Sequence, residues 1–332
     1  MKKPLLIFLS LIIFSFKVSA QSKTDRIDTT NYYSFHINYW LNLHHFLWTE
    51  AFLNVKADSS VINFEFPLSD QTKVDGAIDY YRKELVGKDL RYNEYMSDFK
   101  QWITNPNTSL DRIPKKFATH MDVLIRFDSY YQRYFWPNQR KEVLKTFSEN
   151  IDLIRKTENE FVDRITKLTR HFWQFDPPQV RVDLSYFAKS TTRSFDTRPY
   201  TTIFPTHVVM NVVGENDIKG NWLELLYHES AHGLILGNSF FVAGTIKDLV
   251  EAENLRSPRS LEHVYLFYFT GQITKDLLKK QDIDYPETYM ERGVYEEYFP
   301  LLEKYLAPYM NRKSTLSNAT RDFLKEWKKS QQ

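Results

Sequence analysis

The sequence predicts an α+β protein in which helices predominate, and two observations support this prediction. Apolar residues recur at helical spacing from Asn31 to about Trp173 and again from Asn221 onward. Between these two blocks, three short stretches show the alternation or the apolar runs that are typical of β-strands. The order along the chain is therefore a helical block, a small sheet and a second helical block.

The composition narrows the classes of function that this chain can have. Of its 332 residues, 42% are hydrophobic and 26% are charged, an ordinary balance for a globular protein of one large domain or two small ones. Lysine and arginine number 44 against 42 aspartate and glutamate residues, so the chain lacks the basic field of a nucleic-acid-binding protein. Because cysteine is absent, a bound metal ion must be held by histidine, aspartate or glutamate.

The first twenty residues have the pattern of a secretory signal peptide. Lys2 and Lys3 precede an apolar run over residues 5–16, and Val18-Ser19-Ala20 predicts cleavage after Ala20. The run is shorter than the roughly 20 residues that span a bilayer, so we expect no stable membrane insertion after cleavage. Gln21 would follow the cut where a lipoprotein has cysteine. We therefore expect a secreted or periplasmic protein.

The first block predicts a helical N-terminal region over residues 21–175. Its apolar spacing predicts helices over residues 32–54, 75–86, 91–103 and 119–135. A longer helix is expected to begin at Pro137, because proline is favoured in the first turn. The predicted buried face of this helix comprises Val143, Phe147, Ile151, Ile154, Phe161, Ile165, Leu168 and Phe172. The sequence Asp176-Pro177-Pro178 stops the pattern.

The second region, residues 176–332, begins with the expected strands. Its strand-like stretches are Val180–Tyr186, Tyr200–Phe204 and Thr206–Val213. A polar turn over residues 214–220 then leads to a helix with Asn221 as candidate N-cap and Gly237 as candidate end. Later helices are expected to break near Pro258 and Pro286.

The sequence His228-Glu229-Ser230-Ala231-His232 lies in this helix and predicts a metal site. Residues four apart lie on one helical face, so His228 and His232 can bind the same ion. Glu229 is placed beside the pair, where it can hydrogen-bond a metal-bound water. The ion lowers the pKa of that water towards ~7, and Glu229 can accept its proton as the water attacks a carbonyl.

These five residues, preceded by Thr206–Val213, resemble the active-site segment of the zincin zinc metallopeptidases. The resemblance covers roughly residues 180–272 and implies one Zn²⁺ ion, Glu229 as catalytic residue, and a peptide or protein substrate. It also implies that the strand before the helix pairs with an extended substrate. The metzincin subgroup is excluded, because Ile235 and Asn238 stand where it has glycine and histidine. A gluzincin-like site would take a glutamate from a following helix.

The third metal ligand remains open between His263, Glu262, Glu251 and Glu253. Glu251 has the gluzincin spacing, but its surroundings differ from that group. Residues 261–269 predict a helix that is apolar almost all round, so the polar pair Glu262-His263 in its first turn needs a partner. Residues 261–272 also resemble a segment of uncharacterised bacterial zincin-like proteins in which the histidine recurs. We therefore favour His263.

Peptide hydrolysis also needs a donor for the developing oxyanion. Tyr200, His207, Arg292 and Tyr295 are candidates by residue type, although each also fits a structural role. His44-His45 are adjacent on a predicted helix and point about 100° apart, so they do not readily share one ion. We expect one of them to be a packed or cleft histidine.

The functional prediction is therefore a secreted zinc-dependent metallopeptidase, with His228, His232 and His263 as metal ligands and Glu229 as general base. One alternative is a catalytically inactive zincin-like protein that binds a metal or an envelope partner. Another is a helical carbohydrate-binding or cell-envelope protein in which the motif arises by chance. The pattern predicts no particular oligomeric state.

Overall fold

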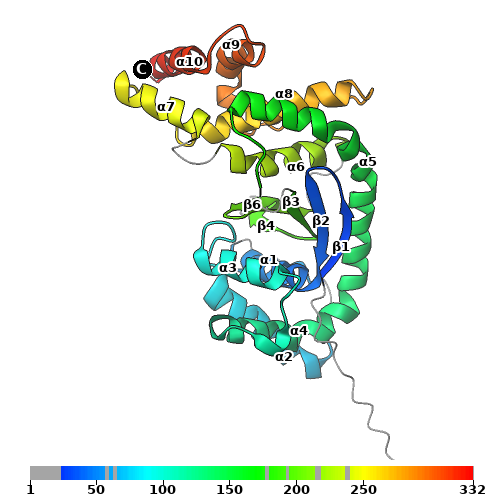
Figure 1. Cartoon of the computed structure of the whole chain (residues 1–332). Helices are drawn as coiled ribbons and strands as arrows, with labels where there is room; N and C mark the ends of the chain where they lie inside the picture. Colours follow the sequence, from blue (N-terminus) through cyan, green and yellow to red (C-terminus); the bar gives the residue numbers. More distant parts are fainter. Residues whose placement is uncertain are drawn as a thin grey trace, which may run out of the picture.

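The computed structural model of the chain describes residues 24–56, 60–62, 66–175, 179–191, 194–213, 218–235 and 240–331. The predicted signal peptide, the breaker at residues 176–178, most of the turn over residues 214–220, Asn238 and the helix end at Gly237 lie outside these ranges. Within them the protein is α+β and mostly helical, built around one mixed five-stranded sheet (Figure 1). No described helix is long and apolar enough to cross a membrane.

The five-stranded sheet has the order β1-β2-β3-β7-β6. Strands β2, β3 and β7 run parallel, whereas β1 and β6 are antiparallel to their neighbours and form the two edges. The strands are β1 (Thr24–Thr29), β2 (Tyr33–Asn38), β3 (Val180–Ser185), β6 (Tyr200–Ile203) and β7 (Thr206–Asn211). A separate hairpin joins β4 (Lys189–Thr191) and β5 (Ser194–Arg198). The three predicted strands are confirmed as β3, β6 and β7.

The helix predicted over residues 32–54 is wrong at its beginning. Residues Tyr33–Asn38 form β2, and α1 begins only at Tyr39. Apolar Tyr33, Phe35 and Ile37 alternate with polar residues, which is a strand period that the long helical pattern behind it obscured. The side chain of Asn38 accepts a hydrogen bond from the backbone N–H of Leu41 at 2.7 Å, which caps the new helix. With β1, residues 21–175 thus contribute two strands to the shared sheet.

The remaining predicted helices of the first region are present, although the helix predicted over residues 75–86 begins earlier, at Leu68, and the one predicted over residues 91–103 begins later, at Glu94. They are α1 (Tyr39–Lys56), α2 (Leu68–Tyr80), the π-helix η1 (Tyr81–Leu85), α3 (Glu94–Thr104), the short η2 (Leu110–Arg112) and η3 (Lys115–Phe117), α4 (Ala118–Tyr134) and α5 (Trp136–Thr169). The long helix α5 buries most of its predicted face. Phe172 is the exception, because α5 ends at Thr169 and leaves that side chain 76% exposed.

The second region continues as helices after the sheet. They are α6 (Asn221–Ala231), the 3₁₀ turn η4 (His232–Leu234), α7 (Phe241–Ala252), α8 (Leu261–Lys279), the 3₁₀ turn η5 (Glu296–Tyr298), α9 (Phe299–Met310) and α10 (Leu316–Ser330). The predicted breaks near Pro258 and Pro286 fall between helices, as expected. Gly220, not Asn221, is the N-cap of α6. Glycine is required there for two reasons. Its φ is 95°, and a Cβ added at this position would lie only 2.4 Å from Cδ1 of Leu278.

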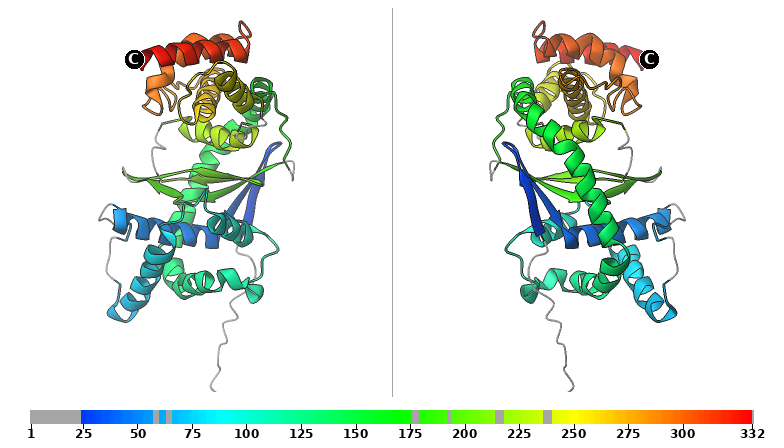
Figure 2. Two further views of the ribbon diagram at one scale, coloured as in Figure 1. Left: turned by 90° about the vertical axis from the view of Figure 1, so that its left-hand side faces the viewer. Right: turned by 90° about the vertical axis from the view of Figure 1, so that its right-hand side faces the viewer.

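The sheet lies between two layers of helices (Figures 1 and 2). Helices α1 to α4 lie on one side, α6 to α10 lie on the other, and α5 runs along the edge from one layer to the other. Alternate side chains of the strands enter two hydrophobic cores. Val208 belongs to the core with α6 and α8, whereas its neighbour Val209 belongs to the core with α1. The helix that carries His228 is thus packed directly on the sheet.

Candidate metal centre

Helix α6 is fixed to its surroundings by two residues of the motif region. The ring of Tyr227 stacks on Phe161 of α5 at 3.8 Å between centroids, and its hydroxyl lies 2.6 Å from Thr157 Oγ1. Ser230, inside the motif, places its hydroxyl 3.1 Å from that of Tyr33 in β2. These contacts are buried, so they hold the helix to both α5 and the sheet.

Three imidazoles meet where α6 packs on α8. His228 lies in the last turn of α6, His232 opens η4, and His263 lies in the first turn of α8. One ring nitrogen from each lies within 4.8 Å of one nitrogen of the other two. His228 and His232 are buried, and His263 is half-buried. Among the described residues, these three histidines, here called the histidine triad, have ligand atoms close enough together to share one metal ion.

The hydrogen bonding of the triad is incomplete. His228 Nε2 lies 3.2 Å from His263 Nε2. Neither ring nitrogen of His232, nor Nδ1 of His228, has a hydrogen-bond partner among the described residues. Leaving buried polar atoms without partners is costly, and a cation with empty coordination positions would satisfy them. The residues therefore fit a nitrogen-ligated divalent ion such as Zn²⁺.

Burial also keeps the imidazoles in the neutral form that binds metals. It lowers the pKa of His228 and His232 well below the ordinary value, and the neighbouring imidazoles add to the effect. Burial lowers the pKa of His263 to about 4, with a further contribution from the charge of Arg91. Neutral imidazole is the ligand species, so no proton has to leave before a metal binds at neutral pH.

Aromatic side chains orient the triad. The ring of Phe267 stacks on His228 with centroids 3.7 Å apart. Tyr295 places its hydroxyl 3.3 Å from His263 Nδ1, which leaves the other nitrogen of His263 facing His228. Tyr295 was a candidate oxyanion donor by sequence, and the structure places it against a triad histidine.

Glu229 lies beside the triad but is not part of it. Its Oε2 is 3.7 Å from His232 Nε2 and accepts a hydrogen bond of 2.7 Å from the hydroxyl of Thr201 in β6. Burial raises the pKa of Glu229 to about 7, although the Thr201 bond and the cations Arg91 and Lys100 oppose that rise. A carboxylate with a pKa near neutrality can both accept and return a proton.

Arg91 is a site residue that the sequence analysis did not single out. Its positive charge lowers the pKa of all three triad histidines and of Glu229. Its Nε is buried and has no hydrogen-bond partner within the described ranges. Arg91 lies in the turn between η1 and α3, far from the motif in sequence, and no local pattern marks it.

The three glutamates considered as third ligands are not in the triad. Glu251 is exposed, and its Oε1 lies 3.9 Å from Nζ of Lys247. Glu253 forms ion pairs with Arg321 and Lys325. Glu262 is half-buried. It is not among the side chains that could share an ion, whereas its neighbour His263 is.

The other oxyanion candidates belong to separate networks. The Tyr200 hydroxyl lies 3.0 Å from His45 Nε2, and His207 Nε2 lies 2.6 Å from Asp183. Arg292 contacts Asn221, Tyr285 and the carbonyl oxygen of Glu287. Both His44 and His45 are buried and hydrogen-bonded, to Tyr81 in the first case and to Ser185 and Tyr200 in the second.

The prediction that the strand before the motif helix pairs with substrate is wrong. Strand β7, which begins at Thr206, is hydrogen-bonded to β3 on one side and to β6 on the other. It therefore has no free edge for a ligand. The edge strand at this end of the described sheet is β6, whose residues Tyr200 to Thr202 are buried, and its Thr201 is the hydrogen-bond partner of Glu229.

Comparison with known proteins assigns no family. No protein-family model, curated protein or solved structure matches the chain. Only the chemistry of the site itself therefore bears on the function of the chain.

Proposed function

We propose that the chain is a zinc-dependent metallopeptidase of the zincin type that is secreted or periplasmic. The observation that supports it is the convergence of three imidazoles, two of them buried with unpartnered nitrogens, beside the carboxylate of Glu229. His228, His232 and His263 would hold the ion. A metal with three histidine ligands keeps its full positive charge, which suits Lewis-acid chemistry.

A bound Zn²⁺ supplies the acidity that makes water a nucleophile at neutral pH and polarises a carbonyl. The protein's own residues do the rest. Glu229 accepts the proton of the attacking water and returns it to the leaving amine, a role that suits its pKa of about 7. Thr201 orients that carboxylate through its hydrogen bond.

The test is metal content followed by activity, using residues 21–332. We expect about one zinc per chain by elemental analysis in the wild type and in Glu229→Gln, and none in His232→Ala. His171→Ala changes a histidine outside the triad and serves as the matched control. With a peptide library, Glu229→Gln should abolish hydrolysis while retaining zinc. Failure to bind stoichiometric metal, even with zinc supplied, contradicts the proposal.

The burial of the site favours one second candidate, a metal-binding protein without catalysis. Glu229 is only 6% exposed and His228 only 1%, as expected for a structural ion. In that case the chain would be an inactive zincin-like or envelope-associated binding protein. This candidate would be favoured if the wild type binds zinc but hydrolyses no library peptide. It would also be favoured if any hydrolysis that is seen persists in Glu229→Gln.

A further inference from the structure

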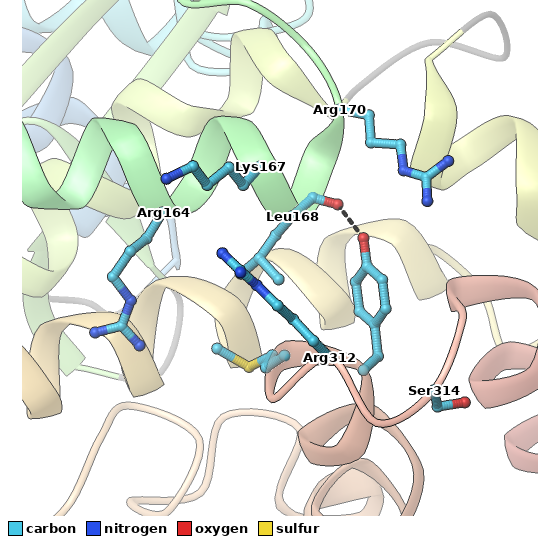
Figure 3. Close-up of a pocket in the computed structure, with 8 residues that line it drawn as sticks. Arg164, Lys167, Leu168, Arg170, Arg312 and Ser314 are labelled. Carbon is cyan, nitrogen blue, oxygen red and sulfur yellow. Dashed lines mark hydrogen bonds between the residues drawn. The ribbon is translucent and has the colours of Figure 1, made fainter.

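The pocket between the C-terminal end of α5 and the loop that joins α9 to α10 is a contact between helices (Figure 3). The hydroxyl of Tyr309 donates a hydrogen bond of 2.5 Å to the carbonyl oxygen of Leu168, one of the last carbonyls of α5, which have no donor within the helix. The side chains of Arg170 and Arg312 point apart, and the guanidinium of Arg170 lies 4.4 Å from the centre of the Phe241 ring. These two cations therefore do not share one ligand.

Two buried histidines share one tyrosine hydroxyl inside the layer of helices α1 to α4 (Figure 1). His44 Nδ1 lies 2.9 Å from the hydroxyl oxygen of Tyr81, and His120 Nε2 lies 2.9 Å from the same oxygen. The centroids of the two imidazole rings are 5.0 Å apart. None of the three residues is more than 2% exposed. They are here called the His–Tyr–His cluster.

The cluster connects elements that are separate in the sequence. His44 belongs to α1, Tyr81 begins the π-helix η1 and His120 belongs to α4. A π-helix is a rare conformation that is frequent at functional sites. The other ring nitrogen of His120, Nδ1, lies 3.3 Å from the hydroxyl of Tyr95 in α3. His120 thus contacts both ends of the stretch over residues 81–95, here called segment 81–95.

No carboxylate in the described part of the chain balances a positive charge at the cluster. Neither His44 nor His120 has an aspartate or glutamate oxygen within 4 Å there. The ring of Phe99 stacks on His120 with centroids 3.8 Å apart. The titratable groups that face the two histidines are His45 in α1, Tyr80 at the end of α2, Tyr81 in η1, Lys88 in the following turn and Tyr95 in α3. Lys88 is a cation, so it adds to the cost of a charged imidazole.

The geometry of the cluster suits neutral imidazoles. A tyrosine hydroxyl has one proton, so Tyr81 donates to one imidazole and accepts a hydrogen bond from the other. With both imidazoles protonated, the proton of Tyr81 would have no acceptor among the described residues, and two cations would lie close together without water. Burial accordingly lowers the pKa of His44 to about 3. It lowers the pKa of His120 well below the ordinary value, and His44 and Lys88 add to this effect.

We propose that the His–Tyr–His cluster is an acid-sensitive lock, which holds segment 81–95 against α1 and α4 at neutral pH and releases it in mildly acidic solution. An imidazole in water gains a proton near pH 6.5, whereas the buried cluster excludes that proton. Below pH 6.5 the open form therefore binds more protons than the closed form, so opening becomes more favourable as the pH falls. None of the three residues belongs to the histidine triad, so the proposal is independent of the proposed peptidase function.

Hydrogen exchange measured by mass spectrometry on residues 21–332 tests the proposal. Labelling times at pH 7.5 and pH 5 are scaled to give equal intrinsic exchange. From pH 7.5 to pH 5, the opening equilibrium constant should rise about 30-fold for each histidine that opening exposes. We therefore expect peptides from segment 81–95 to lose protection by about 30-fold if one histidine is exposed and by about 10³-fold if both are.

Neutral amides in place of the imidazoles remove the titration. His44→Asn and His120→Gln each keep a polar atom near the position that bonds Tyr81. In the double variant, the acid-dependent loss of protection in segment 81–95 should fall to less than about threefold. His171→Asn changes a histidine outside the cluster and should behave like the wild type. Tyr81→Phe should lower protection at both pH values but keep their ratio, because both histidines remain.

Two results overturn the proposal. One is a wild-type segment 81–95 that is as protected at pH 5 as at pH 7.5. The other is an acid-dependent loss of protection that the double variant retains in full, since other buried groups would then cause it. If circular dichroism shows that the double variant is unfolded at pH 7.5, the single variants decide. At least one of them should then reduce the loss about 30-fold, and an unchanged loss in both overturns the proposal.

Discussion

Thr201 Oγ1 lies 2.7 Å from Glu229 Oε2 and 2.9 Å from the carbonyl oxygen of the same residue. One hydroxyl on the edge strand β6 thus ties both the side chain and the backbone of Glu229 to the sheet. The contact is buried, so water does not replace it readily. It orients the carboxylate that we propose as general base.

Thr201→Val should therefore impair hydrolysis without removing the metal. Loss of one buried hydrogen bond to a charged group costs about 1.5 kcal/mol, which corresponds to roughly a tenfold lower kcat/KM. Thr201→Ser keeps the hydroxyl and should retain most of the activity. Steady-state kinetics with zinc content measured in parallel checks this. Equal activity of the valine and wild-type proteins would show that Glu229 needs no such orientation.

Zinc should stabilise the fold through the unpartnered triad nitrogens. A ligand that binds only the folded state, at a thousandfold excess over its Kd, contributes about 4 kcal/mol. For a chain of this size we expect zinc to raise the melting temperature by at least about 5 °C after chelator treatment. Magnesium prefers oxygen ligands and should have little effect. A zinc shift that persists in His232→Ala would place the ion elsewhere.

Local patterns predicted the parts of this structure that depend on short stretches of chain. The one-turn spacing of His228 and His232 needs only a helix, and the strands β3, β6 and β7 each show their period in a few residues. Strand β2 was missed because its six residues run directly into the apolar helix α1. There the pairing of β2 with β1 and β3 decides the structure, and that pairing is not local.

The rest of the site depends on tertiary packing. His263 reaches His228 only because α8 packs on α6, and Thr201 reaches Glu229 only because β6 lies beneath that helix. Arg91 lies in the turn before α3, a helix of the opposite layer (Figure 1), and belongs to no motif. Single residues that approach a site from distant elements leave no periodic trace in the sequence, so spacing arguments cannot find them.

Close packing beside the site predicts a large effect for a small substitution. A Cβ added at Gly233 would lie 2.7 Å from Thr206 Oγ1 and 2.9 Å from a ring carbon of Phe175. Gly233→Ala should therefore destabilise the fold by about 1–3 kcal/mol, because neighbours at the contact between η4 and β7 must shift.

The matched control is the glycine of an exposed helix position. Apart from the backbone of its own helix, no atom of the described residues lies within 4 Å of a Cβ added at Gly76 in α2. Gly76→Ala should stabilise the protein by about 0.5–1 kcal/mol, since alanine loses less conformational entropy in a helix. Urea unfolding of both variants measures the change in free energy of unfolding, which should be opposite in sign for the two. If Gly233→Ala left the free energy of unfolding unchanged, the Thr206 side chain would have to move aside at little cost.

Arg91 should oppose metal binding at the triad. Its charge disfavours positive charge on each triad imidazole, and by the same electrostatics it disfavours a divalent ion there. Arg91→Met should tighten zinc binding a few-fold in a competition assay with a fluorescent chelator. Weaker zinc binding in Arg91→Met would contradict the electrostatic argument.

Lys100 should make the stability of the fold depend on pH above neutrality. Its ammonium group is buried, donates to Thr202 Oγ1 at 2.7 Å and to the carbonyl oxygen of His207 at 3.1 Å, and burial lowers its pKa to about 7. The unfolded chain holds this proton up to about pH 10.4. Between pH 7 and 10 the unfolded state therefore binds more protons, so stability contributed by this group rises with pH.

The comparison of wild type with Lys100→Met isolates this contribution. As pH rises from 7 to 9.5, the free energy of unfolding of the wild type should rise relative to that of Lys100→Met. The rise should be up to about 1.4 kcal/mol per pH unit. Below pH 7 the difference should be flat, because Lys100 is then protonated in both states. Urea unfolding across this range measures it, and staying below pH 10 avoids the ordinary tyrosine titration. A flat difference throughout would show that Lys100 keeps its proton in the folded protein, held by the buried carboxylates Asp183 and Glu229 that favour its charged form.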